Sequence, residues 1–300
     1  MNKKNKYQFL ICISTVICLF SCVTNKTPGL YWHGNQLPGV IKLNDTLYYD
    51  ESEVAVIQYR LYLFWLKHMY GENSEEFRQA QPDQSVWLRS DTCLVFLTEY
   101  YLYHPQYDFY PIVGITQAQA EKFSQWRSEM VFRRMLIYFG KIKEDTAENP
   151  QTRFTIEKFY AGKYQGMQPD SSVIYYPEYR LPSAKEWRLA VKYSDSVVKR
   201  FARQPDYPNV DYTPCLKSNQ NADPTDKVRS RSAVRRRHEP FYNLRGNVSE
   251  WTSEKDVSVG GGWADKNSIL AVQDTFHSSS TNAWTGFRNV CQWKVHTLAK

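Results

Sequence analysis

The segment Asn243–Trp251, NLRGNVSEW, restricts what this chain can fold into more than any other stretch. It spaces a carboxamide, a glycine and a carboxylate at Asn243, Gly246 and Glu250, and the sequence VGGGW follows at residues 259–263. Neither stretch has the periodicity of a helix or a strand. Glycine permits backbone torsions that other residues avoid, and Asn favours turns. We therefore expect an irregular turn that gathers polar groups.

Such a turn can hold a metal ion. Calcium binds six to eight oxygen ligands and often combines carbonyl, carboxamide and carboxylate groups. The side chain of Asn243, the carbonyls of Gly246 and Val248, and Glu250 can converge on one ion. In the alternative, Asn243 and Asn247 stabilise turns and Glu250 forms a surface ion pair. The residue pattern alone leaves both interpretations open.

The N-terminal residues resemble a targeting segment. MNKKNK is basic, the following apolar run is too short to span a bilayer comfortably, and LFSC ends at Cys22. This pattern is typical of a bacterial lipoprotein signal peptide at residues 1–21, which is removed while Cys22 is lipidated. An ordinary secretory signal with a chance cysteine is the alternative. No later segment is apolar enough to span a membrane, so we expect a lipid-anchored, periplasm-facing protein of the outer membrane.

The rest of the chain is predicted to form one domain. Residues 22–46, with scattered proline and glycine, are expected to be an extended tether, and residues 47–300 a single domain. Its cysteines are Cys93, Cys215 and Cys291, whose pairing the sequence leaves open. Because no C-x-x-C occurs, a thiol oxidoreductase or zinc ribbon has no support.

Positive charge is concentrated in one segment. The chain has a formal net charge of +7, and Lys227–His238 holds seven basic side chains, counting His238. This segment can bind an anionic partner such as a cell-wall polymer, lipid headgroups or an acidic protein. The alternative is a solvated loop. Nucleic acid is not expected as a partner of an exported protein.

Several helices and strands are predicted from local patterns. LYYD at residues 47–50 resembles a strand, and a helix is expected from Val56 to Tyr70, ended by Gly71. Residues 85–97 are predicted to hold a short strand. The apolar positions at helical spacing in the helix are Ile57, Leu61, Phe64, Trp65 and His68.

Two capping boxes mark further helix starts, Thr116 with Gln119 and Ser183 with Glu186. The side chains expected to face the core from the second of these helices are Trp187 and Ala190. After Ser194 the chain is predicted to be irregular until Phe241, and short strands joined by loops are expected beyond it. Packed helices followed by irregular sheet suggest a compact α+β domain.

Common hydrolase signatures are missing from the sequence. The six histidines are scattered, and neither G-x-S-x-G nor H-E-x-x-H occurs. Carboxylates that lie close in sequence, such as Asp50, Glu51 and Glu53, are too common a pattern to indicate acid/base catalysis.

Five segments, in order, resemble the formylglycine-generating-enzyme-like (sulfatase-modifying-factor) domain family. The segments are EVAVIQY at 53–59, PIVGITQAQAEKFSQW at 111–126, RLPSAKEW at 180–187, YNLRGNVSEWT at 242–252, and GGGW at 260–263 with GFR at 286–288. The resemblance spans about residues 47–292. It implies a C-type-lectin-like α+β fold rich in irregular structure, with two packed helices and short twisted sheets.

The resemblance also implies what the opening segment does. In the family this segment binds calcium through the Asn side chain, two carbonyls and the Glu, which correspond to Asn243, Gly246, Val248 and Glu250. Arg245 is discordant, because an apolar or small residue is usual there. In oxidising members two cysteines hold copper, and the matching positions here are Asp265 and Leu270. We therefore expect no copper and no oxidation of a substrate cysteine.

One branch of the family fits best. Residues 50–66 and 101–115 are similar to the gliding-motility and type IX secretion lipoproteins, which lack the copper cysteines and have structural roles. The sequence thus predicts a non-catalytic, lipid-anchored component of a secretion or gliding-motility assembly, with outer-membrane or periplasmic proteins as partners. An enzyme of altered chemistry, with Asp265 near the former active site and an exported protein or cell-wall polymer as substrate, is the alternative.

Overall fold

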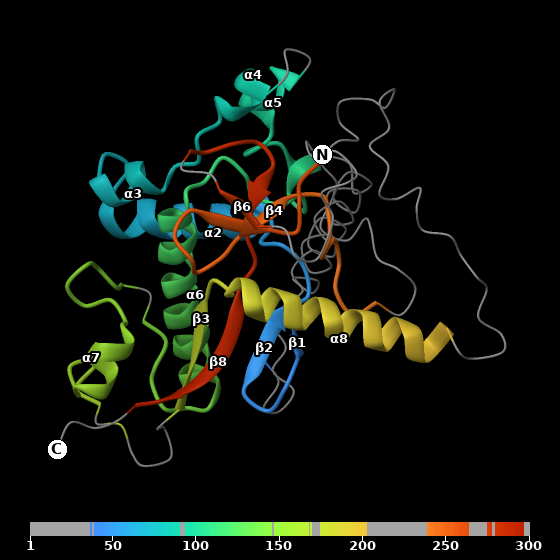
Figure 1. The fold of residues 1–300 in the computed structure, drawn as a ribbon. Helices are drawn as coiled ribbons and strands as arrows, with labels where there is room; N and C mark the ends of the chain where they lie inside the picture. Colours follow the sequence, from blue (N-terminus) through green and yellow to red (C-terminus); the bar gives the residue numbers. More distant parts are fainter. Residues whose placement is uncertain are drawn as a thin grey trace, which may run out of the picture. The chain divides into compact units, whose positions relative to one another are not determined.

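A computed structural model of the chain describes residue 37 and residues 39–90, 94–145, 147–167, 169, 175–202, 239–263, 275–277 and 280–296. The chain divides into two units, Met1–Val40 and Ile41–Lys300. The second unit contains nearly all of the described elements, most of which are labelled in Figure 1. Among the described residues, no helix is both long enough and apolar enough to cross a membrane.

The first sheet joins the two ends of the second unit. Its order is β1–β2–β8–β3, and β8 is antiparallel to both of its neighbours. The strands are β1 (Val40–Lys42), β2 (Leu47–Asp50), β8 (Val290–Val295) and β3 (Tyr175–Arg180). The strand predicted at residues 47–50 is confirmed as β2. Strand β8 therefore lies between β2 and β3, which are both far from it in sequence.

The second sheet carries the opening segment. Its order is β6–β5–β4–β7, with β4 parallel to β7 and antiparallel to β5. The strands are β6 (Thr275–His277), β5 (Val257–Val259), β4 (Ser249–Trp251) and β7 (Thr285–Gly286). The prediction of short strands near the end of the chain is confirmed. Residues 287–289 run from β7 directly into β8 and so connect the two sheets.

The helix predicted from Val56 to Tyr70 and the two helices predicted from capping boxes are the three long helices of the described ranges. They are α2 (Val56–Tyr70), α6 (Gln117–Tyr138) and α8 (Ala184–Ala202). Both predicted capping boxes form: the Thr116 hydroxyl accepts from the Gln119 amide at 3.2 Å, and the Ser183 hydroxyl from the Glu186 amide at 3.1 Å. Helix α6 packs on β3 (Figure 1).

The buried face of α2 differs from the predicted one. Leu61 and Phe64 are 57% and 70% exposed. The side chains buried from this helix are Val56, Tyr59, Tyr62, Leu63, Leu66 and Met69. Tyrosines can enter the core because their hydroxyls find partners, as when the Tyr59 hydroxyl donates to the Ala80 carbonyl at 2.9 Å. A helix with apolar residues on several sides does not define its own inner face.

Two further predictions from local sequence were wrong. The strand expected within residues 85–97 is replaced by the short helices α4 (Val86–Ser90) and α5 (Leu97–Tyr100). The irregular chain expected after Ser194 is instead the continuation of α8 to Ala202. The remaining short helices are α3 (Glu75–Ala80), η2 (Pro105–Tyr107) and α7 (Ile156–Tyr160). Trp187 and Ala190 of α8 are buried as predicted.

Candidate functional site

The two stretches that lack regular periodicity are hydrogen-bonded to each other. The Gly246 amide donates to the Gly260 carbonyl at 2.8 Å, and the Trp263 amide donates to the Asn247 carbonyl at 2.7 Å. The turn needs left-handed backbone torsions, with φ of +47° at Asn243, +80° at Gly246 and +64° at Asn247. Asn and Gly are the residues that adopt these torsions most readily. The opening segment is therefore a built turn ahead of β4.

The carboxylate of Glu53 binds two Asn side chains of this turn. Its Oε2 accepts from Asn243 Nδ2 at 3.1 Å, and its Oε1 accepts from Asn247 Nδ2 at 2.9 Å. Both Asn side chains are thus oriented by one carboxylate that is only 1% exposed. Glu53 was not predicted as a site residue, although it begins the first family-like segment. Its partners follow about 190 positions later, so no local signal could reveal the contact.

Glu250, on β4, points into the core and meets Arg288. Two guanidinium nitrogens of Arg288, Nε and one Nη, lie 2.7 and 2.5 Å from Glu250 Oε1. The other oxygen, Oε2, is buried and has no hydrogen-bond partner among the described residues. Arg288 also donates to the Tyr242 carbonyl at 3.0 Å. The surface ion pair considered for Glu250 is wrong, because both side chains are fully buried.

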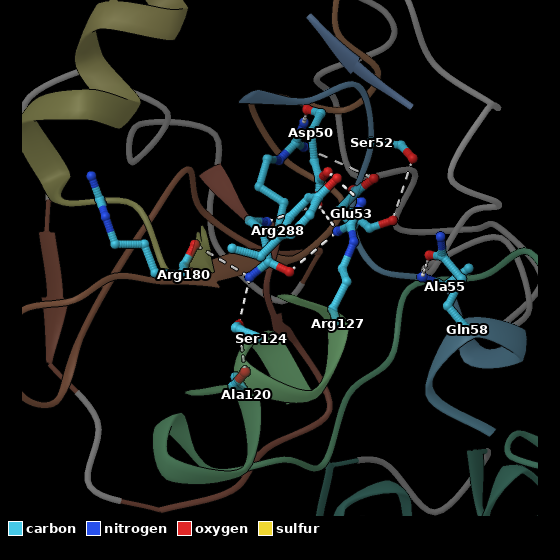
Figure 2. Close-up of polar contacts among 12 residues, drawn as sticks. Asp50, Ser52, Glu53, Ala55, Gln58, Ala120, Ser124, Arg127, Arg180 and Arg288 are labelled. Carbon is cyan, nitrogen blue, oxygen red and sulfur yellow. Dashed lines mark hydrogen bonds and ion pairs between the residues drawn. The ribbon is translucent and has the colours of Figure 1, made fainter. Parts of the chain in front are cut away.

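A second ion pair joins Arg127 and Asp50, and Figure 2 shows these two residues together with Arg288. Arg127 of α6 binds Asp50 of β2 through two contacts of 2.6 and 2.9 Å. Asn289 binds both members of this pair. Its backbone amide donates to Asp50 Oδ2 at 2.9 Å, and its side-chain Oδ1 accepts from Arg127 at 3.2 Å. Helix α6 and strand β2 are thereby both bound to residues 287–289.

This buried network contains more acidic than basic groups. The carboxylates are Asp50, Glu53 and Glu250, and the guanidinium groups are Arg127 and Arg288, three against two. Burial raises the pKa of Glu250 to about 8, although the charge of Arg288 opposes the shift. Burial likewise raises the pKa of Glu53, against the charge of Arg288 and the hydrogen bonds from the two Asn side chains. A proton or an added cation would balance the charge.

The structure accounts for the discordant Arg245. Its guanidinium binds the carboxylate of Asp195 on α8, with contacts of 3.2 and 2.8 Å. An apolar residue at this position could not make the bond. Arg245 therefore fastens the turn to α8.

The predicted calcium ligands lie in one turn and the strand that follows it, while other predicted positions lie outside the described residues. Asn243, Val248 and Glu250 are buried, and Gly246 lies in the same turn. The structure does not describe Cys22, Lys227–His238, Asp265 or Leu270, nor Cys93 and Cys215. Within the described ranges, no three His, Cys, Asp or Glu side chains are grouped as a metal site. The predicted calcium ligands are of a different kind, because three of the four are neutral oxygens.

Cys291 is a free, buried cysteine on β8. Burial raises the pKa of its thiol, although the charge of Arg127 opposes the shift. A reactive thiol is usually exposed and has a lowered pKa. Cys291 is therefore a core residue and does not replace the thiols that the family-like segment lacks.

The fold and the site together define a class of protein: an irregular α+β domain in which a buried ionic network holds an Asn- and Gly-containing turn ahead of β4. Residues 41–293 match the sulfatase-modifying factor enzyme 1-like domain. The chain belongs to this family, and the predicted α+β fold is confirmed.

Two solved structures have weak overall similarity to the chain. The structure titled "Crystal Structure of CarF" has 15% sequence identity and a TM-score of 0.44, and the match covers 88% of this chain and 95% of that one. Treponema denticola variable protein 1 has 16% identity and a TM-score of 0.40, covering 88% and 90%. A comparison with curated proteins found no significant match.

Proposed function

We propose that this protein is a non-catalytic module of its family, anchored by lipid at Cys22 to the outer membrane. The observation that carries the proposal is the replacement of the family's two copper-binding cysteines by Asp265 and Leu270. Carboxylate and alkyl side chains cannot provide the thiolate pair of the oxidising members. Cys291 offers no substitute, because it is buried in the core with a raised thiol pKa.

The function that fits such a module is a structural or binding role in a secretion or gliding-motility assembly. Its partners are then outer-membrane or periplasmic proteins. The similarity of residues 50–66 and 101–115 to the lipoproteins of those assemblies supports this role.

Purification from native membranes tests this role. The chain should co-purify in stoichiometric amounts with outer-membrane or periplasmic assembly proteins, and radiolabelled palmitate should be incorporated in the wild type but not in Cys22→Ser. Recovery of the wild type only as a lone monomer would contradict the assembly role. For the alternative enzyme, Asp265→Asn is the informative variant. Full rescue of a null strain by this variant removes the catalytic role of that carboxylate.

We further infer that the turn binds calcium through the Asn243 side chain, the Gly246 and Val248 carbonyls and Glu250. These are the hard oxygen ligands that calcium prefers. Two features of the structure fit the ion: the buried Oε2 of Glu250 has no hydrogen-bond partner among the described residues, and the network holds three carboxylates against two guanidinium groups. When bound, calcium would neutralise excess negative charge and fasten β4 to the turn.

Thermal unfolding and calorimetry test the calcium site. The full chain, first treated with chelator, should release or absorb heat on adding calcium, and its Tm should rise. At a calcium concentration of 100 times Kd, the expected gain is about 2.7 kcal/mol in the free energy of unfolding. Glu250→Gln should lose most of this gain relative to its own chelated state. Glu144→Gln, which removes a carboxylate of an exposed ion pair, is the matched control.

A calcium-induced shift that is equal in Glu250→Gln and in the wild type would exclude Glu250 as a ligand. Absence of both heat and shift in the wild type would exclude the site.

A further inference from the structure

Helix α8 presents a charged face that the buried network does not use. Its exposed lysines are Lys185, Lys192 and Lys199, spaced by seven residues. Because two turns of an α-helix take about 7.2 residues, the three lysines lie along one side and span about 21 Å. Arg188 and Arg200 lie on the same side. Figure 1 shows α8 as the long yellow helix.

The acidic side chains of α8 are neutralised within the protein. Glu186 binds Arg180 with contacts of 2.7 and 2.8 Å. Asp195 binds Arg245. By contrast, none of the five basic side chains of α8 forms an ion pair or hydrogen bond with any described residue. The helix therefore adds five positive charges to one surface and no uncompensated negative charge.

The opposite side of α8 is not available to a partner. Trp187, Ala190 and Val191 are at most 1% exposed and pack in a core cluster with β2 and β5. The helix cannot turn this apolar side outward unless the domain unfolds. Leu189, which is 40% exposed, is the one large apolar residue on the charged side. Contact with a partner must consequently be electrostatic, with little insertion of apolar groups.

These features favour one class of partner. Protein interfaces are depleted in lysine and enriched in aromatic residues at their centre. The charged side of α8 is instead rich in lysine and poor in aromatic residues. The three lysines are also about 10 Å apart along a convex helix, so they do not converge on one small anion. Lysine and arginine clusters on an amphipathic helix are instead typical of binding to anionic lipid headgroups.

We propose that the side of α8 bearing Lys185, Lys192 and Lys199 binds the surface of an anionic phospholipid bilayer. This contact is separate from the assembly role and from the predicted calcium site, and it would orient the domain on the membrane. It is distinct from lipidation at Cys22, since an acyl chain does not discriminate between neutral and anionic headgroups.

The distribution of the full chain between two vesicle populations tests the proposal. One population is phosphatidylcholine, and the other is phosphatidylcholine with phosphatidylglycerol, loaded with sucrose so that it can be sedimented. A lipid anchor would insert into both vesicle populations alike. The ratio of protein bound to the two populations therefore reports headgroup preference alone. The wild type should favour the anionic vesicles at low salt, and the preference should decline at high salt.

Two triple variants with the same charge change locate the contact. K185Q/K192Q/K199Q should lower the preference about fivefold per lysine, which is on the order of 100-fold for three. K122Q/K143Q/K163Q alters exposed lysines elsewhere and should change it less than about twofold. Equal losses in both variants would show that net charge alone is responsible and would overturn the proposal.

Acetylation of lysines in the wild type gives an independent readout. Lys185, Lys192 and Lys199 should react more slowly on anionic vesicles than on neutral ones, while Lys143 and Lys163 should not change. Equal reactivity on the two vesicles would contradict the proposal. If soluble polyglutamate protected these three lysines and the protein showed no preference for anionic vesicles, the partner would be an acidic polymer and the membrane proposal would be wrong.

Discussion

At the scale of single residues, Arg288 has the most demanding position in the protein. It is 0% exposed and lies against Glu250 and Glu53. A buried charge is tolerated only when it is paired and hydrogen-bonded, and this guanidinium also binds backbone carbonyls. Removing it would leave two carboxylates buried without their cation.

Arg288→Met should therefore destabilise the fold by about 3–5 kcal/mol in urea denaturation. The matched control is Arg134→Met. Arg134 is also paired with a glutamate, but it is about half exposed and its contact is 3.6 Å long. That change should cost less than about 1 kcal/mol. Similar losses in the two variants would show that the buried network adds little to stability.

Asp83 is a residue whose ionisation matters at low pH. Burial raises its pKa, but hydrogen bonds from Ser85, Arg89 and Thr281 outweigh this effect and lower the pKa to about 2. Because the folded pKa lies below the ordinary value of 3.8, the carboxylate stabilises the fold above about pH 4. This contribution is lost as the pH falls toward 2.

Asp83→Asn tests this dependence. The variant should be less stable than the wild type at neutral pH, by roughly 1 kcal/mol or less because the side chain is partly exposed. The difference should vanish near pH 2. Urea denaturation at several pH values measures it, and a difference that persists unchanged at pH 2 would assign the loss to something other than charge.

At the scale of elements, a glycine lets three segments of the chain approach one another closely. Gly114 has a φ of +72°, and a Cβ there would lie 2.5 Å from the Asp83 carbonyl oxygen. Its amide donates to the Asn282 carbonyl at 3.0 Å, and its carbonyl accepts from the Asp83 amide at 2.7 Å. Three segments are thus held together at one residue that has no side chain.

Gly114→Ala should be clearly more destabilising than Gly140→Ala. Gly140 has a similar φ of +66°, but a Cβ there would meet nothing within 4 Å. The backbone strain is therefore matched, and the difference reports the steric contact alone. We expect Gly114→Ala to lower the free energy of unfolding by about 1–3 kcal/mol more than the control. Equal losses would show that the three segments can separate slightly at little cost.

At the scale of the whole molecule, residues 287–289 connect the two sheets of the second unit. Asn289 is fully buried, and its side chain binds Arg127 and the Ser124 hydroxyl of α6, the latter at 2.6 Å. Residues of β2, α6 and the β7–β8 connection thus share one polar network (Figure 2). We expect the two sheets to unfold together for this reason.

Asn289→Ala should lower hydrogen-exchange protection in β2, β4 and β8 by a similar amount, about 2 kcal/mol, because buried partners lose their hydrogen bonds. Asn149→Ala is the control, since the exposed side chain of Asn149 accepts hydrogen bonds from the nearby backbone amides of Gln151 and Thr152. It should affect its own turn alone. Loss of protection confined to one sheet in Asn289→Ala would show that the sheets unfold independently.

Local sequence determined the features that depend on a few neighbouring residues. The capping boxes at Thr116 and Ser183 begin helices where predicted, and Asn243 and Gly246 form the expected turn. These outcomes follow because each signal and its hydrogen bond lie within three or four residues. Local sequence did less well where a segment had apolar residues on several sides, as in α2, or was short and largely apolar, as in residues 85–97.

Only the tertiary structure decided which side of α2 is buried and which charges meet. Glu53 contacts Asn243 across 190 positions, and Arg288 contacts the carbonyl of Asp50 across 238. Such pairs depend on how two sheets and three helices pack, and no periodicity or spacing records them. The sequence by itself predicted the turn and its polar atoms, while packing supplied the buried carboxylate and guanidinium groups that hold it, because buried charges are tolerated only where the fold brings their partners together.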